Sequence, residues 1–144
     1  MSKVEFSAVV EGAAQQVWNV VKQFGEIKNW HPSIVDSHIE GAGPEIVGCI
    51  RTLTLSDGAV VRERLLSVDD SALRLSYRFE ESPLPLDNYV ASVELVALSG
   101  QDRTLVSWLA SFDLREPNSA EHYQALIRSL IVDGHGGLQA LLAR

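Results

Sequence analysis

The segment from 46 to 114 constrains the fold most strongly, because apolar and polar residues alternate through almost all of it. Alternation with a period of two places side chains on opposite faces of a β-strand, so it predicts strands buried on one face. The expected strands are about 46–56, 59–69, 72–81, 88–98 and 103–114. The connections between them are too short for the crossovers that parallel neighbours need. The pattern therefore predicts an antiparallel meander.

A strand and two helical stretches are predicted before this meander. Residues 3–11 alternate like a strand, and residues 13–24 carry apolar side chains at the spacing of an amphipathic helix, which Gly25 is expected to end. A short helical turn at 26–30 and an indistinct strand at 33–40 follow. The chain is therefore expected to mix helices and strands rather than to be all-β.

The last segment, 119–143, is predicted to be one long helix with Ser119 as its N-cap. Its apolar stripe consists of Tyr123, Leu126, Ile127, Leu130, Ile131, Leu138, Leu141 and Leu142. Gly134, Gly136 and Gly137 interrupt it, although a glycine inside a helix costs about 1 kcal/mol relative to alanine. Two interpretations stay open: a local break in the helix, or a place where a bulky group approaches its backbone.

The apolar faces of three strands are expected to lie under this helix, on the concave side of the sheet. They consist of Leu73, Leu75, Tyr77 and Phe79; Tyr89, Ala91, Val93, Leu95 and Ala97; and Val106, Trp108, Ala110, Phe112 and Leu114. The tyrosines add hydroxyl groups to an otherwise apolar surface. Such a surface is typical of a pocket for a small molecule.

The Asp57-Gly58 turn leaves two registers open for the first hairpin of the meander. A two-residue turn would put Leu53 opposite Arg62 and so pair a core residue with a surface residue. A three-residue loop with Gly58 in the left-handed conformation puts Leu53 opposite Val61 instead. Only the second register buries the apolar side chains of both strands, so we expect that one.

The same register places Arg51 opposite Glu63 on the inner face of the sheet. Burial can adjust the proton affinity of a carboxyl group to acid–base work, so Glu63 is a candidate catalytic residue and Arg51 a ligand anchor. The alternative is a structural ion pair that fixes the hairpin. His31 is the second catalytic candidate, because histidine titrates near neutral pH. Its alternative is an exposed or capping residue beside Pro32.

Composition excludes several classes of protein. The 144 residues, 46% of them hydrophobic, suit one globular domain over 1–144, and the net charge of −7 argues against nucleic-acid binding. Cys49 is the only cysteine, which excludes an internal disulfide and a cysteine-rich zinc site. No apolar run reaches about 20 residues, and no signal peptide is recognisable. We expect a cytoplasmic protein without metal, cofactor or membrane span, and the sequence leaves a homodimer open.

Several segments together resemble the START-like (SRPBCC) superfamily over nearly the whole chain. They are Val17-Trp18, Phe24-Gly25-Glu26-Ile27, Trp30-His31-Pro32-Ser33-Ile34, Val47-Gly48-Cys49-Ile50-Arg51, Glu63-Arg64-Leu65 and Leu86-Asp87-Asn88-Tyr89, followed by the last helix. The branch that the chain resembles is the bacterial polyketide cyclase/dehydrase type. The superfamily also includes the birch-pollen-allergen-like proteins and the plant abscisic acid receptors.

The resemblance implies an α+β helix-grip fold in a single START-like domain. In that fold a curved antiparallel sheet of about seven strands wraps round a long C-terminal helix, and two short helices lie near the N-terminus. A cavity between sheet and helix binds apolar small molecules. The order of elements expected from the periodicities agrees with this architecture.

The resemblance to the hormone receptors also matches single positions. A receptor lysine that grips the carboxylate of the ligand corresponds to His31 here, a glutamate that holds a water corresponds to Glu63, and a pocket tyrosine corresponds to Tyr89. The gate and latch of the receptors are replaced here by Ser56-Asp57-Gly58-Ala59 and Leu84-Pro85-Leu86. These departures argue against a hormone-receptor role and against a phosphatase partner.

Three functions follow as hypotheses. The first is a protein that binds an apolar or aromatic small molecule, such as a lipid or a polyketide-like metabolite. The second is a cyclase/dehydratase-type enzyme that uses Glu63 or His31 for proton transfer. The third is an interaction module whose cavity is filled by its own side chains. The expected ligand-binding residues are Arg51, Leu53, Glu63, Tyr77, Phe79, Tyr89, Trp108, Ile131 and Gly134.

Overall fold

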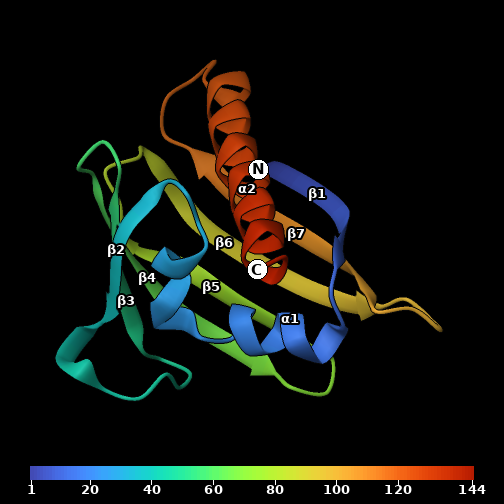
Figure 1. Ribbon diagram of the computed structural model, residues 1–144. Helices are drawn as coiled ribbons and strands as arrows, with labels where there is room; N and C mark the ends of the chain where they lie inside the picture. The colour runs from blue at the N-terminus through green and yellow to red at the C-terminus, as the bar shows by residue number, and fades with distance from the viewer.

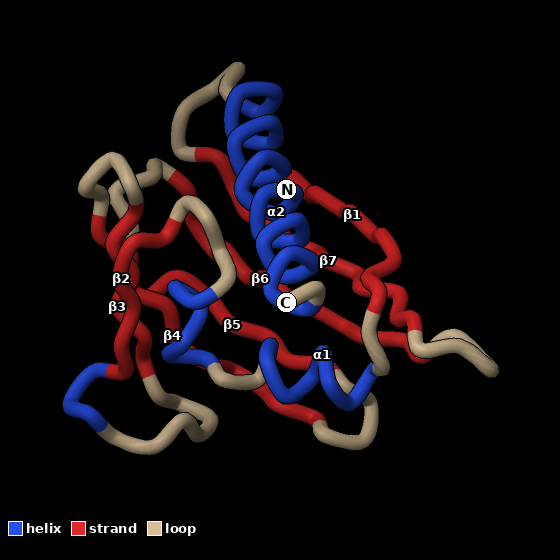
Figure 2. Tube along the Cα trace, in the orientation of Figure 1, coloured by secondary structure: helices blue, strands red, loops and turns tan.

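The strands and the last helix form two layers in the computed structural model, which describes residues 1–144 (Figures 1 and 2). The strands are β1 (Ser2–Glu11), β2 (Ile34–Ile39), β3 (Ile50–Leu55), β4 (Val60–Asp69), β5 (Arg74–Glu81), β6 (Leu86–Ala97) and β7 (Arg103–Leu114). The helices are α1 (Ala14–Val21), α2 (Ala120–Leu142) and the 3-10 helices η1 (Phe24–Asn29) and η2 (Glu40–Ala42). The curved sheet wraps round α2, which confirms the helix-grip fold.

All seven strands belong to one sheet in the order β1-β7-β6-β5-β4-β3-β2. Every neighbouring pair is antiparallel, and β3 to β7 follow one another in sequence, so the predicted meander is confirmed. β1 and β2 lie at opposite edges, and α1 and η1 carry the chain from one edge to the other (Figure 1). None of the helices is long and apolar enough to span a membrane.

The first hairpin of the meander has the register expected from its apolar side chains. Leu53 lies opposite Val61, and Arg51 lies opposite Glu63. Gly58 has a φ of 91°, the left-handed conformation that the three-residue loop needs. Two charged residues therefore face the interior between apolar neighbours, Arg51 at 4% and Glu63 at 6% exposure.

The core consists of two clusters of apolar side chains on the concave side of the sheet. The larger cluster includes Trp18 and Phe24 from the N-terminal helices and Leu138 from the C-terminal half of α2. The smaller one lies under the N-terminal half of α2 and includes Phe112 and Ile127. Tyr77 and Phe79 of β5 pack against both clusters. Strand β5 therefore crosses the region where the two clusters meet.

The glycines of α2 mark a close approach and not a break, because the helix runs without interruption from Ala120 to Leu142. A Cβ atom at Gly137 would overlap the carbonyl oxygen of Trp30, and one at Gly134 would lie 2.8 Å from Cδ2 of His31. Gly136 has no atom within 4 Å of the same position. Two of the three glycines thus make room for the segment between η1 and β2.

Four expectations from the sequence are wrong in detail. Gly25 does not end α1, which stops at Val21; it lies within η1, where a Cβ atom would be 2.8 Å from Cγ1 of Ile39. Residues 46–49 form a loop before β3. Ser119 precedes α2, but its hydroxyl donates to the carbonyl of Glu116 and caps no helical N–H. Ala97, the last residue of β6, is exposed rather than buried.

Candidate functional site

A cavity of about 500 Å³ lies between the sheet and α2. Of the 24 residues that line it, 16 are hydrophobic. Its lining includes every residue expected from the sequence to contact a ligand or to act as a catalytic group: His31, Arg51, Leu53, Glu63, Tyr77, Phe79, Tyr89, Trp108, Ile131 and Gly134. The fold therefore brings these residues together, although they come from β3 to β7, α2 and the segment that follows η1.

The remaining lining residues were not singled out from the sequence as contacts. They are Ile27, Trp30, Ser33, Ile34, Leu55, Ser56, Asp57, Ala59, Val61, Pro83, Leu84, Leu126, Ile127 and Leu130. Ser56, Asp57 and Pro83 are exposed, so the β3–β4 turn and the β5–β6 connection form the rim of the cavity. The apolar stripe of α2 could have indicated Leu130 and its neighbours, but loop residues at a rim follow no periodicity.

The polar end of the cavity is built round the ion pair of Arg51 and Glu63. Nε of Arg51 donates to Oε1 of Glu63 over 2.9 Å, and Nη2 lies 2.7 Å from the same oxygen. Nη1 donates to the carbonyl oxygen of Phe24 over 3.0 Å. The guanidinium carbon lies 3.9 Å from the ring centre of Phe24 and 4.7 Å from that of Tyr77. The guanidinium is thus held by hydrogen bonds in its plane and by aromatic rings beside it.

The two carboxylate oxygens of Glu63 differ in their hydrogen-bond partners. The hydrogen bond and the short contact from Arg51 both go to Oε1, so Oε2 has no hydrogen-bond partner in the protein. The only side-chain nitrogen or oxygen that is both sealed from solvent and without a partner is Nε1 of Trp30. Oε2 is therefore within reach of a molecule in the cavity and can accept a hydrogen bond or a proton.

Two tyrosines complete the polar end. Burial, helped by the nearby carboxylate of Glu63, raises the pKa of Tyr77 to about 12. Burial also raises the pKa of Tyr89 well above its usual value, and no hydrogen bond contributes to that change. Both side chains are therefore neutral hydroxyl groups at neutral pH. They can donate hydrogen bonds to an oxygen atom of a bound molecule, but they are not bases.

His31 is buried, with 8% of its surface exposed, so the interpretation as an exposed residue is wrong. Nε2 lies 2.8 Å from the carbonyl oxygen of Leu130, and Nδ1 accepts a hydrogen bond from the N–H of Ser33 over 3.1 Å. This pattern requires the neutral tautomer with its proton on Nε2. Burial lowers the pKa of His31, and the Leu130 carbonyl and Asp133 oppose that change. Both ring nitrogens are thus engaged by the backbone.

His135 is buried but does not belong to the cavity lining. Its Nδ1 accepts a hydrogen bond from Nε1 of Trp108 over 3.1 Å, and its ring packs edge-on against Phe6. Its contacts are therefore with β1 and β7, on the side of α2 away from the ion pair. They hold the indole of Trp108, which is itself a lining residue.

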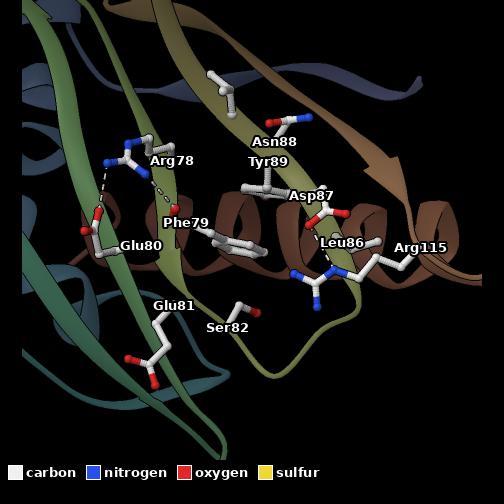
Figure 3. Close-up of a pocket in the computed structure, with 11 residues that line it drawn as sticks. Arg78, Phe79, Glu80, Glu81, Ser82, Leu86, Asp87, Asn88, Tyr89 and Arg115 are labelled. Carbon is white, nitrogen blue, oxygen red and sulfur yellow. Dashed lines mark hydrogen bonds and ion pairs between the residues drawn. The ribbon is translucent and has the colours of Figure 1, made fainter.

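A second hollow, of about 480 Å³, lies on the outer face of the sheet beside the end of the β5–β6 ladder (Figure 3). The pairing of β5 with β6 stops at Arg78 and Val90, and the strands diverge beyond it. The rings of Phe79 and Tyr89 stack in this gap, with centroids 3.8 Å apart and planes at 7°. Both residues line the inner cavity as well, so the stacked pair separates the two hollows.

Comparison with known proteins places the chain in a family. The profile of the family "Polyketide cyclase / dehydrase and lipid transport" matches residues 1–143, so the chain belongs to this family. No curated protein matches the chain. Among solved structures, the protein XoxI from Bacillus cereus is 25% identical with a TM-score of 0.88, covering 99% of this chain and 96% of that one.

Two more distant structures have the same fold. A START superfamily protein from Mycobacterium smegmatis is 14% identical with a TM-score of 0.83, covering 99% of this chain and 98% of that one. The Zhui aromatase/cyclase from Streptomyces sp. R1128 is 18% identical with a TM-score of 0.84, covering 99% and 93%. At these identities the likeness concerns the fold alone, and it confirms the START-like architecture.

Proposed function

We propose that this protein binds an apolar or aromatic small molecule in the cavity between the sheet and α2. The observation that carries the proposal is an open volume of about 500 Å³ with a mostly apolar lining and one polar end. Binding sites for small molecules typically have about 300–1,000 Å³ and few, well-placed polar groups. The family description, which includes lipid transport, agrees with this function. The open volume also argues against an interaction module whose interior is filled by its own side chains.

Blocking the cavity from α2 tests the proposal. Ile131 lines the cavity, whereas its neighbour Val132 is 40% exposed on the other side of the helix. The change Ile131→Trp fills the cavity, and Val132→Trp adds the same side chain outside it. We expect uncharged fluorescent probes, such as N-phenyl-1-naphthylamine and a dansyl-labelled fatty alcohol, to bind the wild type and Val132→Trp but not Ile131→Trp. Equal binding to both variants would place the probes elsewhere and contradict the proposal.

The free oxygen of Glu63 favours a second candidate function, a cyclase/dehydratase-type reaction in the same cavity. Oε2 has no protein partner and could take a proton from a polyketide-like substrate. The neutral hydroxyls of Tyr77 and Tyr89 could donate hydrogen bonds to the carbonyl oxygen on which negative charge develops. His31 is a weaker candidate for proton transfer, because both of its ring nitrogens already have partners.

The variants Glu63→Gln and Arg51→Met separate the two functions. An enzyme would lose turnover of a polyketide-type substrate in Glu63→Gln while it still binds the substrate. A binding protein would show no turnover in the wild type, and changes at either residue would alter only its affinity.

A further inference from the structure

We propose that the cavity selects uncharged ligands that carry a hydroxyl group and excludes carboxylates of the same size. This inference rests on the proposed binding function and names the chemical class of its ligand. It is drawn from the charge and the hydrogen-bond state of the groups at the polar end, and it differs from the carboxylate binding that the resemblance to the hormone receptors would suggest for the position of His31.

The only cation in the lining is already neutralised. Among the lining residues, Arg51 is the single arginine or lysine. Its guanidinium is bonded to Glu63 and to the carbonyl of Phe24. The rings of Phe24 and Tyr77 lie over it. A carboxylate in the cavity would have to displace the Glu63 carboxylate from Arg51 and leave that charge buried without a partner.

The other lining groups offer a bound anion no favourable electrostatic interaction. Glu63 and Asp57 are both acidic, so with Arg51 the lining has a net charge of −1 when His31 is neutral. His31 is neutral in its observed hydrogen-bond pattern, and its Nε2–H already faces the Leu130 carbonyl. Transfer of a carboxylate from water into such a surrounding is unfavourable.

The outer hollow contains cations, but they do not face the cavity. Arg78 lies 3.0 Å from Glu80, and Arg115 lies 2.9 Å from Asp87. Figure 3 shows both pairs around the outer hollow, beside the stacked rings of Phe79 and Tyr89. These arginines are therefore paired and stand on the far side of the stacked rings from a ligand in the cavity.

A hydroxyl group of a ligand has a hydrogen-bond acceptor in the cavity. Oε2 of Glu63 is an ionic acceptor without a protein donor, and a hydrogen bond from a neutral hydroxyl to a carboxylate is among the stronger ones in proteins. Tyr77 and Tyr89 line the same cavity as Glu63. Each can in turn donate to the oxygen of the ligand. The polar end thus offers both an acceptor and donors to an alcohol or a phenol.

Matched pairs of ligands test the proposal. We would measure the affinities of 2-naphthol against 2-naphthoate, and of dodecan-1-ol against dodecanoate, by calorimetry at pH 7 with the unmodified protein. We expect the alcohol or phenol of each pair to bind at least tenfold more tightly than its carboxylate. An equal or tighter carboxylate would overturn this inference and leave the proposed binding function intact. If no member of either pair binds, both the inference and the binding function fail.

A charge-neutral variant locates the source of the selectivity. In Glu63→Gln the acceptor becomes neutral and Arg51 loses its partner, so we expect the preference for the alcohol to fall at least fivefold. Glu11→Gln is the matched control, because Glu11 also pairs with an arginine but lies exposed on β1. We expect it to keep the wild-type preference. An unchanged preference in a folded Glu63→Gln variant would overturn the role given to Glu63, and the wild-type pairs decide the inference if that variant does not fold.

Discussion

Arg51 and Glu63 are the only buried residues among the aspartates, glutamates, lysines and arginines of this protein. Their side chains are 5% and 8% exposed, and each compensates the charge of the other. A buried ion pair adds little to stability compared with apolar residues of the same shape, but removal of one partner leaves an unpaired buried charge. Removal of both charges should therefore destabilise the protein less than removal of one.

The variant Arg51→Met should lower the free energy of unfolding by about 3–5 kcal/mol, because it leaves the Glu63 carboxylate buried and unpaired. The double variant Arg51→Met/Glu63→Gln should recover part of this loss. Arg103→Met, which breaks the exposed pair with Glu11, should cost at most about 1 kcal/mol. Urea unfolding of the four proteins measures these differences. A loss below about 1 kcal/mol in Arg51→Met would show that the charge is not buried as described.

His31 gives the molecule a pH dependence whose sign follows from its burial. Its pKa is lowered in the folded protein from the ordinary 6.5, as is that of His135. As the pH falls below about 6.5, the unfolded chain takes up protons first, so the folded state loses stability. Above the pKa that His31 has in the unfolded chain, its contribution to the free energy of unfolding is complete. As the pH falls toward the lower pKa of His31 in the folded protein, this contribution is lost by at most about 1.4 kcal/mol per pH unit.

We therefore expect the free energy of unfolding to fall between pH 7 and pH 5.5, and to fall less in His31→Gln than in the wild type. His122 is exposed, so His122→Gln is the control and should keep the wild-type dependence. Urea unfolding at both values of pH provides the measurement. The same dependence in His31→Gln and the wild type would mean that His31 titrates as a solvated histidine.

At the scale of secondary-structure elements, α2 is positioned by the segment that joins η1 to β2. The Trp30 carbonyl packs on Gly137 and the His31 ring packs on Gly134, where no side chain larger than hydrogen fits. His31 also donates to the carbonyl of Leu130, one turn before Gly134. Since Trp30 and His31 also line the cavity, these contacts join α2 to one of its walls.

Alanine at Gly137 and alanine at Gly136 should therefore have opposite effects on the free energy of unfolding. Gly137→Ala should lower the free energy of unfolding by about 1–3 kcal/mol or more, because its Cβ overlaps the Trp30 carbonyl. Gly136→Ala meets nothing within 4 Å and should raise it by up to about 1 kcal/mol through helix propensity. Thermal and urea unfolding compare the two variants. Stabilisation by both would show that the helix and the η1–β2 segment are not in contact.

Features that depend on residues close together in the sequence could be predicted. The alternation in β3 and β4 identified the strands, and the requirement that Leu53 meet Val61 selected the right register. That register in turn predicted the pairing of Arg51 with Glu63. The expected cavity residues from β3 to β7 follow from the same period of two, because a strand buried on one face shows which side chains point inward.

Features that depend on distant segments could not be predicted. The partner of His31 is the carbonyl of Leu130, 99 residues away, and no local pattern indicates such a contact. Gly134 and Gly137 left two interpretations open for the same reason. Phe79 stacks on Tyr89 beyond the last β5–β6 pair, Arg78 and Val90, and next to a change of register between β6 and β7. The alternation within one strand predicts which side chains point inward, but it does not predict where the pairing of two strands ends.

At the scale of the whole molecule, the fold keeps a ligand-sized volume open inside a chain of only 144 residues. Residues of β3, β4 and β5 face α2 across the cavity, and both core clusters contribute residues to its lining. Membership of the polyketide cyclase/dehydrase and lipid transport family is consistent with a cavity that serves binding or catalysis. One fold hosts many activities, so the lining residues decide which one this chain has.

Native mass spectrometry of the freshly purified protein, followed by denaturing extraction of any bound molecule, tests the central claim most directly. The account predicts a discrete added mass, or one that appears with members of a panel of alcohols, sterols and phenolic polyketide-like compounds. The added mass should be absent in Ile131→Trp and present in Val132→Trp. A protein that stays at its apo mass with the whole panel, or one whose adduct survives in Ile131→Trp, would contradict a binding cavity between the sheet and α2.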